Sequence, residues 1–249
     1  MRYVDANLGA PGRWMLAAGL IGFGLVGLYF QHSIDGLQPF DLQVPWVWLN
    51  SAILVLGGIG LAWNRVSAKA ALVLWGLLTV LLFVHAPGLV AEPADPVRWV
   101  SAMEVLGLLA ACMLVAAPAR TDFRLAARIA VGLMLIVFGA VHWLYADAVA
   151  GMIPDWMPGR AIWPLFTGTA NIAAGLAIAS GVLARPASAL VGAMFASWIV
   201  LVHAPRLLAA PGERSEWVAG ALAFALTGVA WTVNGALHRS GGDLQSRSR

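Results

Sequence analysis

Residues 84–100, VHAPGLVAEPADPVRWV, recur in similar form 118 residues later as residues 202–218, VHAPRLLAAPGERSEWV. The two stretches align without a gap and are identical at nine of seventeen positions. A segment that recurs at a fixed interval is typical of an internal repeat, and the repeated unit then sets the architecture. The sequence therefore predicts a tandem duplication of a unit about 118 residues long.

The composition is that of an integral membrane protein. Hydrophobic residues make up 61% of the chain, charged residues 11%, and the mean hydropathy is +0.82, whereas an ordinary soluble domain has about 25% charged residues. The apolar runs are continuous and long enough to cross about 30 Å of hydrocarbon as helices, and they lack the alternation of a membrane β-barrel. We predict eight transmembrane helices, at residues 14–31, 46–63, 70–87, 99–118, 126–145, 161–183, 187–205 and 217–236.

The basic residues indicate how these spans are oriented. With a cytoplasmic amino terminus, eleven Lys and Arg residues fall on the cytoplasmic side and only four, Arg98, Arg160, Arg206 and Arg214, fall outside. The positive-inside rule then predicts an even number of spans and two cytoplasmic termini. Because the basic residues are scattered over loops, the net charge of +3 does not indicate nucleic-acid binding.

Each half of the chain contributes four spans, so both halves enter the membrane in the same direction. We expect an all-α protein of two parallel four-helix bundle repeats, related by an axis along the membrane normal. The first, diverged repeat occupies residues 1–118 and the second residues 119–238. Residues 239–249 are polar and are predicted to be a disordered tail.

Polar residues inside the apolar runs are the candidate functional groups. Glu104 is the foremost, because a carboxylate in a span costs about 2.5–3.5 kcal/mol at the membrane centre unless it faces protein or water. Leu222 occupies its place in the second repeat, so the fold does not require the acidic group. In an alternative interpretation Glu104 only pairs with Arg98 or a histidine near the interface. Asn171 in the sixth span is a further buried polar group that needs a partner.

Four of the five histidines are predicted to lie at the outer ends of spans. His85 pairs with His203 in the repeat, and His32 pairs less closely with His142, since a proline follows each at a nearly equal distance. Imidazole can ligate a metal or haem, or carry a proton near neutral pH. We expect these histidines and Glu104 to surround a quinone or a small polar ligand, with Asp147 in an adjoining loop. Haem or a metal at His85 and His203 is one alternative, and a histidine that merely ends a copied helix is another.

Other features narrow the chemistry. Cys112 is the single cysteine, so a disulfide or Cys-x-x-Cys relay within one chain is excluded. Most of the twelve tryptophans fall near the outer surface, where anchoring at the membrane interface explains them. Phosphate-binding glycine loops, His-Glu-x-x-His and Gly-x-Ser-x-Gly do not occur in the sequence.

Several short motifs follow one another in the second half. They are His142-Trp143, Ile153-Pro154-Asp155-Trp156-Met157-Pro158, Gly168, Ala174-Gly175-Leu176 and His203-Ala204-Pro205-Arg206. Their order resembles the DoxX-like family of four-span membrane proteins, and the resemblance covers nearly all of the second half. The first half is similar to a diverged copy, with Val44-Pro45-Trp46 in place of the fuller proline motif and Gly88 in place of Arg206.

The resemblance implies a four-helix bundle for each repeat, similar to a DoxX dimer fused head to tail. Some members resemble the membrane subunit of thiosulfate:quinone oxidoreductase and most have no assigned role, so the fold alone does not give a function. By position the resemblance adds Trp156 and Arg206 to the ligand-binding candidates. The other positions that it carries over are His142, Pro154, Pro158, Gly168 and His203.

Three functions are compatible with these features. The first is a protein of the bacterial inner membrane that is associated with oxidoreduction, binds a quinone or small polar ligand near the extracytoplasmic face and contacts a soluble or membrane redox partner. The second is a proton-coupled small-molecule transporter in which Glu104 carries the proton, although the cytoplasmic halves of the spans have almost no polar residues to line a path. The third is a non-catalytic membrane scaffold whose redox partner performs the chemistry.

Overall fold

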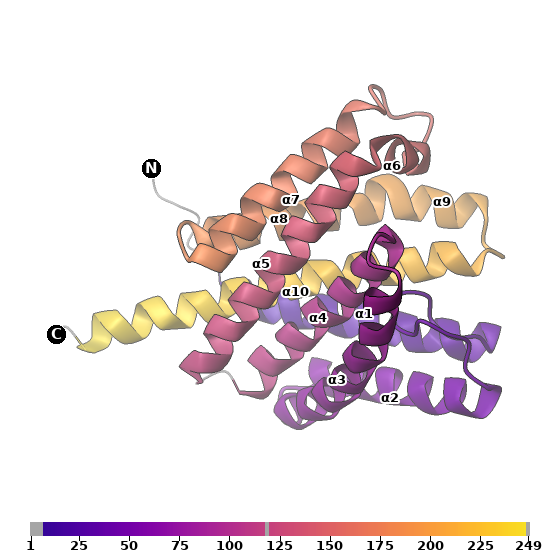
Figure 1. Ribbon diagram of the computed structural model, residues 1–249. Coiled ribbons are helices and arrows are strands. Elements are labelled where there is room, and N and C mark those ends of the chain that lie inside the picture. The colour runs from indigo at the N-terminus through magenta and orange to yellow at the C-terminus, as the bar shows by residue number, and fades with distance from the viewer. Residues whose placement is uncertain (1–6, 118–119, 248–249) are drawn as a thin grey trace.

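The structure, a computed structural model, describes residues 7–117 and 120–247, and the regular secondary structure in these residues is helical (Figure 1). Eight helical segments in this part of the chain are long and apolar enough to span a membrane, which confirms the prediction of an all-α membrane protein with eight spans. Each of the eight overlaps one of the predicted runs. In chain order the helices are α1 (Gly9–Phe30), α2 (Val44–Ala62), α3 (Ser67–Ala91), α4 (Pro96–Ala116), α5 (Thr121–Leu144), α6 (Ala146–Met152), α7 (Ile162–Ser180), α8 (Ala184–Trp198), η1 (Ile199–His203), α9 (Ala204–Ala209) and α10 (Arg214–Arg247).

The seventh span is not a uniform α-helix. It consists of α8, the π-helical segment η1 and α9. Pro205 is the second residue after η1, and because proline has no N–H it cannot donate the α-helical bond one turn back. A π-helical turn is one way in which a helix accommodates such a break. The corresponding helix of the first half, α3, contains Pro87 at the matching position and yet is α-helical throughout.

The first and last spans, α1 and α10, form the most extensive helix contact in the described structure. Small residues allow their close approach, since a side chain at Gly12 would meet Trp231 and one at Gly19 would meet Ala225. The corresponding contact in the middle of the chain joins α4 and α5. The first helix of each predicted repeat therefore contacts the last helix of the other repeat, although α5 contacts α7 of its own half more extensively than it contacts α4. The two halves are interlocked through these pairs and through α4, which also contacts α10.

Hydrogen bonds recur 118 residues apart in the two halves. The indole N–H of Trp99 donates to the carbonyl of Pro93 at 2.9 Å, and Trp217 and Pro211 form the same bond at the same distance. Backbone bonds close corresponding turns after α3 and after α9. This recurrence supports the predicted duplication. The turn bonds run from Glu92 N to Gly88 O and from Asp95 N to Glu92 O in the first half, and from Ala210 N to Arg206 O and from Glu213 N to Ala210 O in the second.

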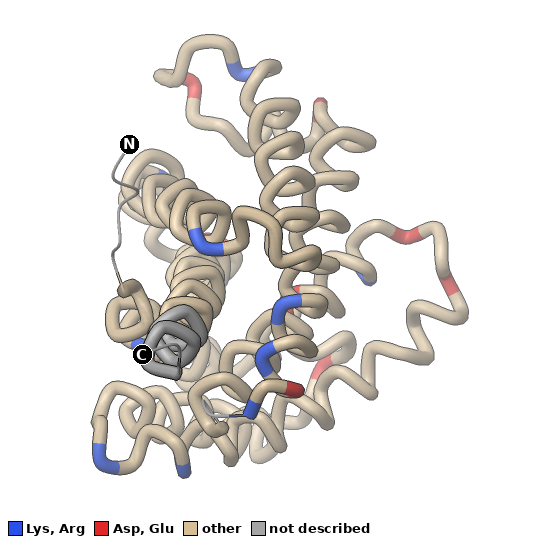
Figure 2. Tube along the Cα trace, turned by 90° about the vertical axis from the view of Figure 1, so that its left-hand side faces the viewer, with Lys and Arg blue, Asp and Glu red and all other residues tan. Residues whose placement is uncertain are grey.

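Charged residues separate between the two ends of the bundle. Figure 2 views the end at which both ends of the chain lie, and Lys and Arg gather there, whereas Asp and Glu lie mainly toward the far end. We call the far end, which carries the loops 31–43, 92–95, 145–161 and 210–213, the distal end. The distribution is compatible with cytoplasmic termini and an extracytoplasmic distal end, and this orientation stays a prediction.

The carboxyl-terminal helix is longer than expected. The membrane-spanning part of α10 is Arg214–His238, but the helix continues to Arg247. Residues 239–247, for which we predicted a disordered tail, are helical instead. Because the segment contains no proline and continues an existing helix, it avoids the cost of helix nucleation. The predicted repeat boundary at residues 118–119 and the last two residues of the predicted tail lie outside the described residues.

The spans share one apolar core, in which Leu16, Leu54, Leu108 and Val229 are fully buried. The outward faces of the same helices also carry large apolar side chains, such as Phe83, which is 73% exposed. Apolar residues on both sides of a helix are expected where one side faces protein and the other faces lipid. The surface is therefore suited to contact with a lipid bilayer.

Candidate functional site

Glu104 lies in α4, about two turns after the helix begins at Pro96, and only 9% of the residue is exposed. Among the residues that the structure describes, its carboxylate has no hydrogen bond and no ion pair. Arg98, which we considered as its partner, pairs instead with Glu92 and Asp95. The alternative in which Glu104 is one half of an ion pair is therefore wrong. A buried carboxylate without a partner is costly, which makes this position unusual.

The carboxylate of Glu104 lies against the backbone of the loop 31–43. A Cβ atom at Gly36 would come within 2.5 Å of Glu104 Oε2. Gly36 also has a φ of +87°, a conformation that glycine adopts without the steric cost that other residues pay. Both the space and the backbone conformation at position 36 thus favour glycine, and the loop can approach the carboxylate closely.

His85 reaches the same loop from α3. The residue is buried, and its Nε2 donates to the carbonyl oxygen of Leu37 at 3.2 Å. Because a carbonyl oxygen can only accept, this bond assigns the proton to Nε2 and leaves Nδ1 as an acceptor when the ring is neutral. Glu104 and His85 therefore contact neighbouring residues of one loop, Gly36 and Leu37.

Gln38 is a third buried polar residue, in the same loop and two positions after Gly36. It is 6% exposed, and its Oε1 accepts a hydrogen bond from Ile34 N at 2.7 Å. Its Nε2 is buried and has no partner in the part of the chain that the structure describes. We call Glu104, His85, Gly36, Leu37 and Gln38 the Glu104 cluster. Its chemistry combines an unpaired carboxylate, which can accept a hydrogen bond or hold a proton, with an unpaired amide donor.

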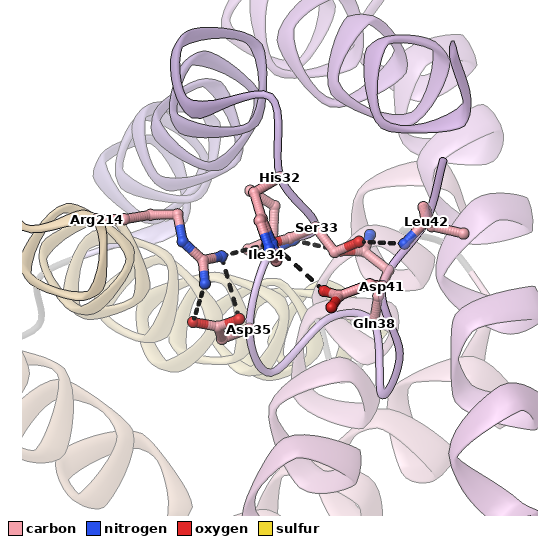
Figure 3. A network of polar contacts seen from close by, with 8 residues as sticks. All are labelled: His32, Ser33, Ile34, Asp35, Gln38, Asp41, Leu42 and Arg214. Carbon is pink, nitrogen blue, oxygen red and sulfur yellow. Dashed lines mark hydrogen bonds and ion pairs between the residues drawn. The ribbon is translucent and has the colours of Figure 1, made fainter. Parts of the chain in front are cut away.

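The loop 31–43 is held together largely by its own side chains (Figure 3). Ser33 Oγ accepts a hydrogen bond from Leu42 N at 2.7 Å, and His32 Nδ1 lies 3.4 Å from Asp41 Oδ1. Ile34 is only 1% exposed, so the apolar part of the loop faces the protein. Compact surface loops packed by their own side chains are frequently functional. His32 is thus at the surface of the loop, where about half of its side chain is exposed, and not within the Glu104 cluster.

Arg214, at the beginning of α10, connects this loop to the second half of the chain (Figure 3). Its Nη2 lies 3.1 Å from Asp35 Oδ2, and its Nη1 donates to Asp35 Oδ1 at 3.1 Å. Nη1 also donates to the carbonyl oxygen of Ser33. The guanidinium therefore binds both a side chain and the backbone of the loop that covers the Glu104 cluster.

A second group of polar residues lies at the distal end of the other half. The guanidinium of Arg206 donates to the two carboxylate oxygens of Glu216 at 2.6 and 2.8 Å, and to the carbonyl of Met152 at 2.8 Å. His203 lies one turn before Arg206, and its Nδ1 is buried and unpaired. We call His203, Arg206, Glu216 and Met152 the His203 cluster. Here the carboxylate is fully paired, in contrast to Glu104.

His142 belongs to neither cluster by any bond in the described structure, since its Nδ1 donates to the carbonyl of Phe138 within α5 at 2.7 Å. Asn171 is 1% exposed in α7, and its Oδ1 has no partner. Asp147 and Trp156 are exposed in the distal segment after α5. The predicted candidates are therefore distributed over several places at or near the distal end.

The packing of glycines shows which residues of the first two helices correspond in each half. A side chain at Gly24 would meet Val55 of α2, and one at Gly139 would meet Ile172 of α7 in the same way. These glycines are 115 residues apart, so the residue that corresponds to His142 is Gly27 and not His32. The predicted pairing of His32 with His142 is wrong, because α1 ends at Phe30 and His32 lies beyond it in the loop.

The structure does not gather the histidines around one ligand. Within the described ranges, no three His, Cys, Asp or Glu side chains lie close enough together to hold a metal ion. His85 and His203, the metal candidates, belong to separate clusters, and Cys112 is buried and free. The residue types at the Glu104 cluster suit hydrogen bonding to an organic ligand better than ligation of a metal.

Gln38, Gly36, Arg214 and Glu216 were not among the predicted site residues. Gly36 and Gln38 lie in a loop whose composition has no periodic pattern, so no local signal marks them. Arg214 meets Asp35 across 179 positions of sequence. Only Glu216 could have been predicted from the sequence, because it and Arg206 carry opposite charges at the facing ends of two spans that a short loop joins.

Residues 123–204 match the family model described as DoxX. The match begins in α5 and ends at the first residue of α9, so it covers His142, Trp156, Asn171 and His203. It does not cover the Glu104 cluster. No curated protein and no solved structure matches the chain.

Proposed function

We propose that this membrane protein of the DoxX family binds a quinone at the Glu104 cluster. The match to the DoxX family model covers residues 123–204, whereas the proposed ligand site belongs to the first half of the chain. In this proposal residues 1–118 form a diverged repeat that contributes the site, and residues 119–238 form the DoxX repeat that supports it. The observation that carries the proposal is the buried carboxylate of Glu104, which has no partner among the described residues.

Unpaired polar groups inside a protein are expensive. A buried donor or acceptor that lacks a partner costs about 1–3 kcal/mol, and more if it is charged. In the Glu104 cluster Nε2 of Gln38 is such a group, and the carboxylate belongs to a residue that is only 9% exposed and has no hydrogen bond or ion pair among the described residues. A ligand with both an acceptor and a donor would recover this free energy, whereas the fold itself gains nothing from leaving the groups unpaired. This favours a binding site over a structural role.

Quinone and quinol match these two groups. A quinone carbonyl oxygen accepts a hydrogen bond, which Gln38 Nε2 can donate, and a quinol hydroxyl donates one, which the carboxylate of Glu104 can accept. His85 holds the loop beside them through Leu37, and its Nδ1 provides a further acceptor. Glu104 lies near the end of a span, so a head group there would leave an isoprenoid tail in the bilayer.

The proposed setting follows from the same assignment. We place the distal end on the extracytoplasmic side of a bacterial inner membrane, because the basic residues gather at the other end. A bound quinone would associate the protein with oxidoreduction, in which a soluble or membrane redox partner exchanges electrons with the quinone pool. The bilayer-facing apolar surface supports the membrane location, and the redox role is the proposed step.

Quinone binding can be measured on the purified protein. We expect the wild-type protein in lipid nanodiscs to retain quinone that solvent extraction recovers, and to bind added ubiquinone-1 in calorimetry. Glu104→Gln should weaken binding by about tenfold, which corresponds to about 1.4 kcal/mol. Glu213→Gln, an exposed glutamate at the same end, should bind as the wild type does.

A second pair of variants uses the repeat. His85→Ala should weaken quinone binding, whereas His203→Ala, at the corresponding position of the other half, should leave it unchanged. A wild-type protein that neither retains nor binds quinone would refute the proposal. Equal binding by Glu104→Gln and the wild type would show that the quinone site lies elsewhere.

A further inference from the structure

We infer that the loop 31–43 is a strap that controls access to Glu104 from the distal face, and that Arg214 of the second half latches it. The inference rests on the proposed function only in that the strap covers the proposed ligand site. The contacts of the loop fall into two groups, those within the strap and those between the strap and the rest of the protein. The difference between these groups indicates how the strap can move.

The contacts within the strap make it a coherent unit. Leu42 N donates to Ser33 Oγ, Ile34 N donates to Gln38 Oε1, and His32 lies in ion-pair range of Asp41. These contacts join the beginning of the loop to its end (Figure 3). The strap can therefore be displaced as one piece without losing its own hydrogen bonds.

The polar contacts from the strap to the rest of the protein are few. Apart from the backbone bonds by which Gln43, the last residue of the strap, begins α2, they are in the described structure the bonds of Arg214 to Asp35 and Ser33, and the bond of His85 to Leu37. The first set comes from α10 and the second from α3, so two different elements hold the strap. Of these, the Arg214 contact is the more accessible, since the side chain of Asp35 is 58% exposed. An exposed ion pair is weak enough to open and close.

The backbone of the strap also favours movement, at its first residue and at one position inside it. Gln31, which directly follows α1, has a φ of +53°, and Gly36 has a φ of +87°. A residue other than glycine in this left-handed region carries backbone strain that the surroundings must hold in place. Displacement of the strap would relieve the strain at Gln31 and would uncover Glu104, whose carboxylate lies against Gly36. Arg214 thus restrains the strap in the closed position.

A cysteine at position 104 can report on the strap without any ligand. In Glu104→Cys, we would measure the rate at which a water-soluble methanethiosulfonate modifies the thiol, a reaction that forms a mixed disulfide and releases a sulfinate. The native Cys112 is fully buried and gives no background in the folded protein. Adding Arg214→Gln to Glu104→Cys should raise the rate by about fivefold, because the latch is lost.

The control variant is Arg160→Gln. Arg160 pairs with Asp155 in a different distal loop, so its loss removes an ion pair at the same end without touching the strap. The rate for Glu104→Cys with Arg160→Gln should equal that of Glu104→Cys alone. Modification of Cys112 would report unfolding of a variant, and in that case Asp35→Asn replaces Arg214→Gln as the test.

An exchange of the two charges distinguishes a latch from a general structural role. Asp35→Arg and Arg214→Asp should each accelerate modification of the thiol at position 104, and the double variant should slow it again. Equal rates with and without Arg214→Gln and Asp35→Asn would overturn the inference. This outcome would leave the quinone proposal intact, and a failure to bind quinone would leave the strap result intact, so the two tests fail independently.

Discussion

The Glu104 cluster and the His203 cluster occupy corresponding ends of the two halves, but they differ in whether the acidic side chain has an ion-pair partner. In the second half, Arg206 reaches across to Glu216 with two hydrogen bonds. In the first half, the positions that correspond to these residues hold Gly88 and Arg98. The acidic group of that half, Glu104, lies deeper in the helix and has no partner among the described residues.

The arginine at this place comes from a different helix in each half, from α4 as Arg98 in the first and from α9 as Arg206 in the second. A Cβ atom at Gly88 would come within 2.7 Å of Arg98 Nη1, so the side chain of Arg98 fills the space that glycine leaves. In the second half the guanidinium comes from Arg206, on the preceding helix, and points toward the position that corresponds to Arg98. The same gap between helices is filled in both halves from opposite sides. Arg206 pairs there with Glu216, whereas Arg98 pairs with Glu92 and Asp95 and leaves Glu104, deeper in α4, without a partner among the described residues.

The ion pair of the second half should be the larger contributor to stability. Arg206→Ala leaves Glu216, whose side chain is 13% exposed, without its partner, and we expect a loss of about 2–3 kcal/mol in the free energy of unfolding. Arg98→Ala removes a more exposed pair and should cost less than about 1 kcal/mol. Denaturant unfolding in detergent measures both. Equal losses would show that the two clusters do not differ in the way that their pairing suggests.

Substitution of a glycine in each of two distal loops distinguishes the cost of backbone strain from the cost of a clash with Glu104. Gly36→Ala introduces a Cβ into a left-handed conformation and against the carboxylate, and should cost about 2 kcal/mol. Gly159 has a φ of +68°, but a Cβ there would have only an ordinary contact with Ile162. Gly159→Ala should therefore cost about 1 kcal/mol. In a Glu104→Ala background the two costs should become equal, and a persistent difference would place the obstruction elsewhere.

Replacing Glu104 by the residue of the other half tests whether the site is maintained at the expense of stability. Glu104→Leu, which copies Leu222, removes an unpaired buried carboxylate and should stabilise the protein by about 1–2 kcal/mol. Quinone binding should be lost in the same variant. Thermal unfolding and calorimetry give the two readouts. A destabilised Glu104→Leu would mean that the carboxylate has a structural partner.

The two histidines should show the smallest difference. His85 donates a hydrogen bond to the strap, whereas Nδ1 of His203 is unpaired. His85→Ala should therefore be less stable than His203→Ala by about 1 kcal/mol. Hydrogen exchange of the loop 31–43 should also increase in His85→Ala alone. Unchanged hydrogen exchange of the loop in that variant would argue against a role of His85 in restraining the strap.

The sequence predicted the parts of the fold that depend on local composition. The eight spans follow from apolar runs, and Glu104 was identified because a carboxylate interrupts one of these runs. The single pocket of four histidines was not found. Histidines at equal depths on different helices face different neighbours, and their depth could be predicted while their direction could not. His142, for example, bonds to its own helix, and His32 lies in a surface loop because α1 ends at Phe30.

The sequence by itself determined that this chain spans a membrane eight times and that polar groups collect at one end, because the transfer of an apolar segment into lipid depends on that segment alone. Only the tertiary structure decided that the first helix packs along the last and that Arg214 meets Asp35. It also left Glu104 without a partner among the described residues while pairing Glu216. Such contacts join distant positions, and they depend on which faces of the helices pack together.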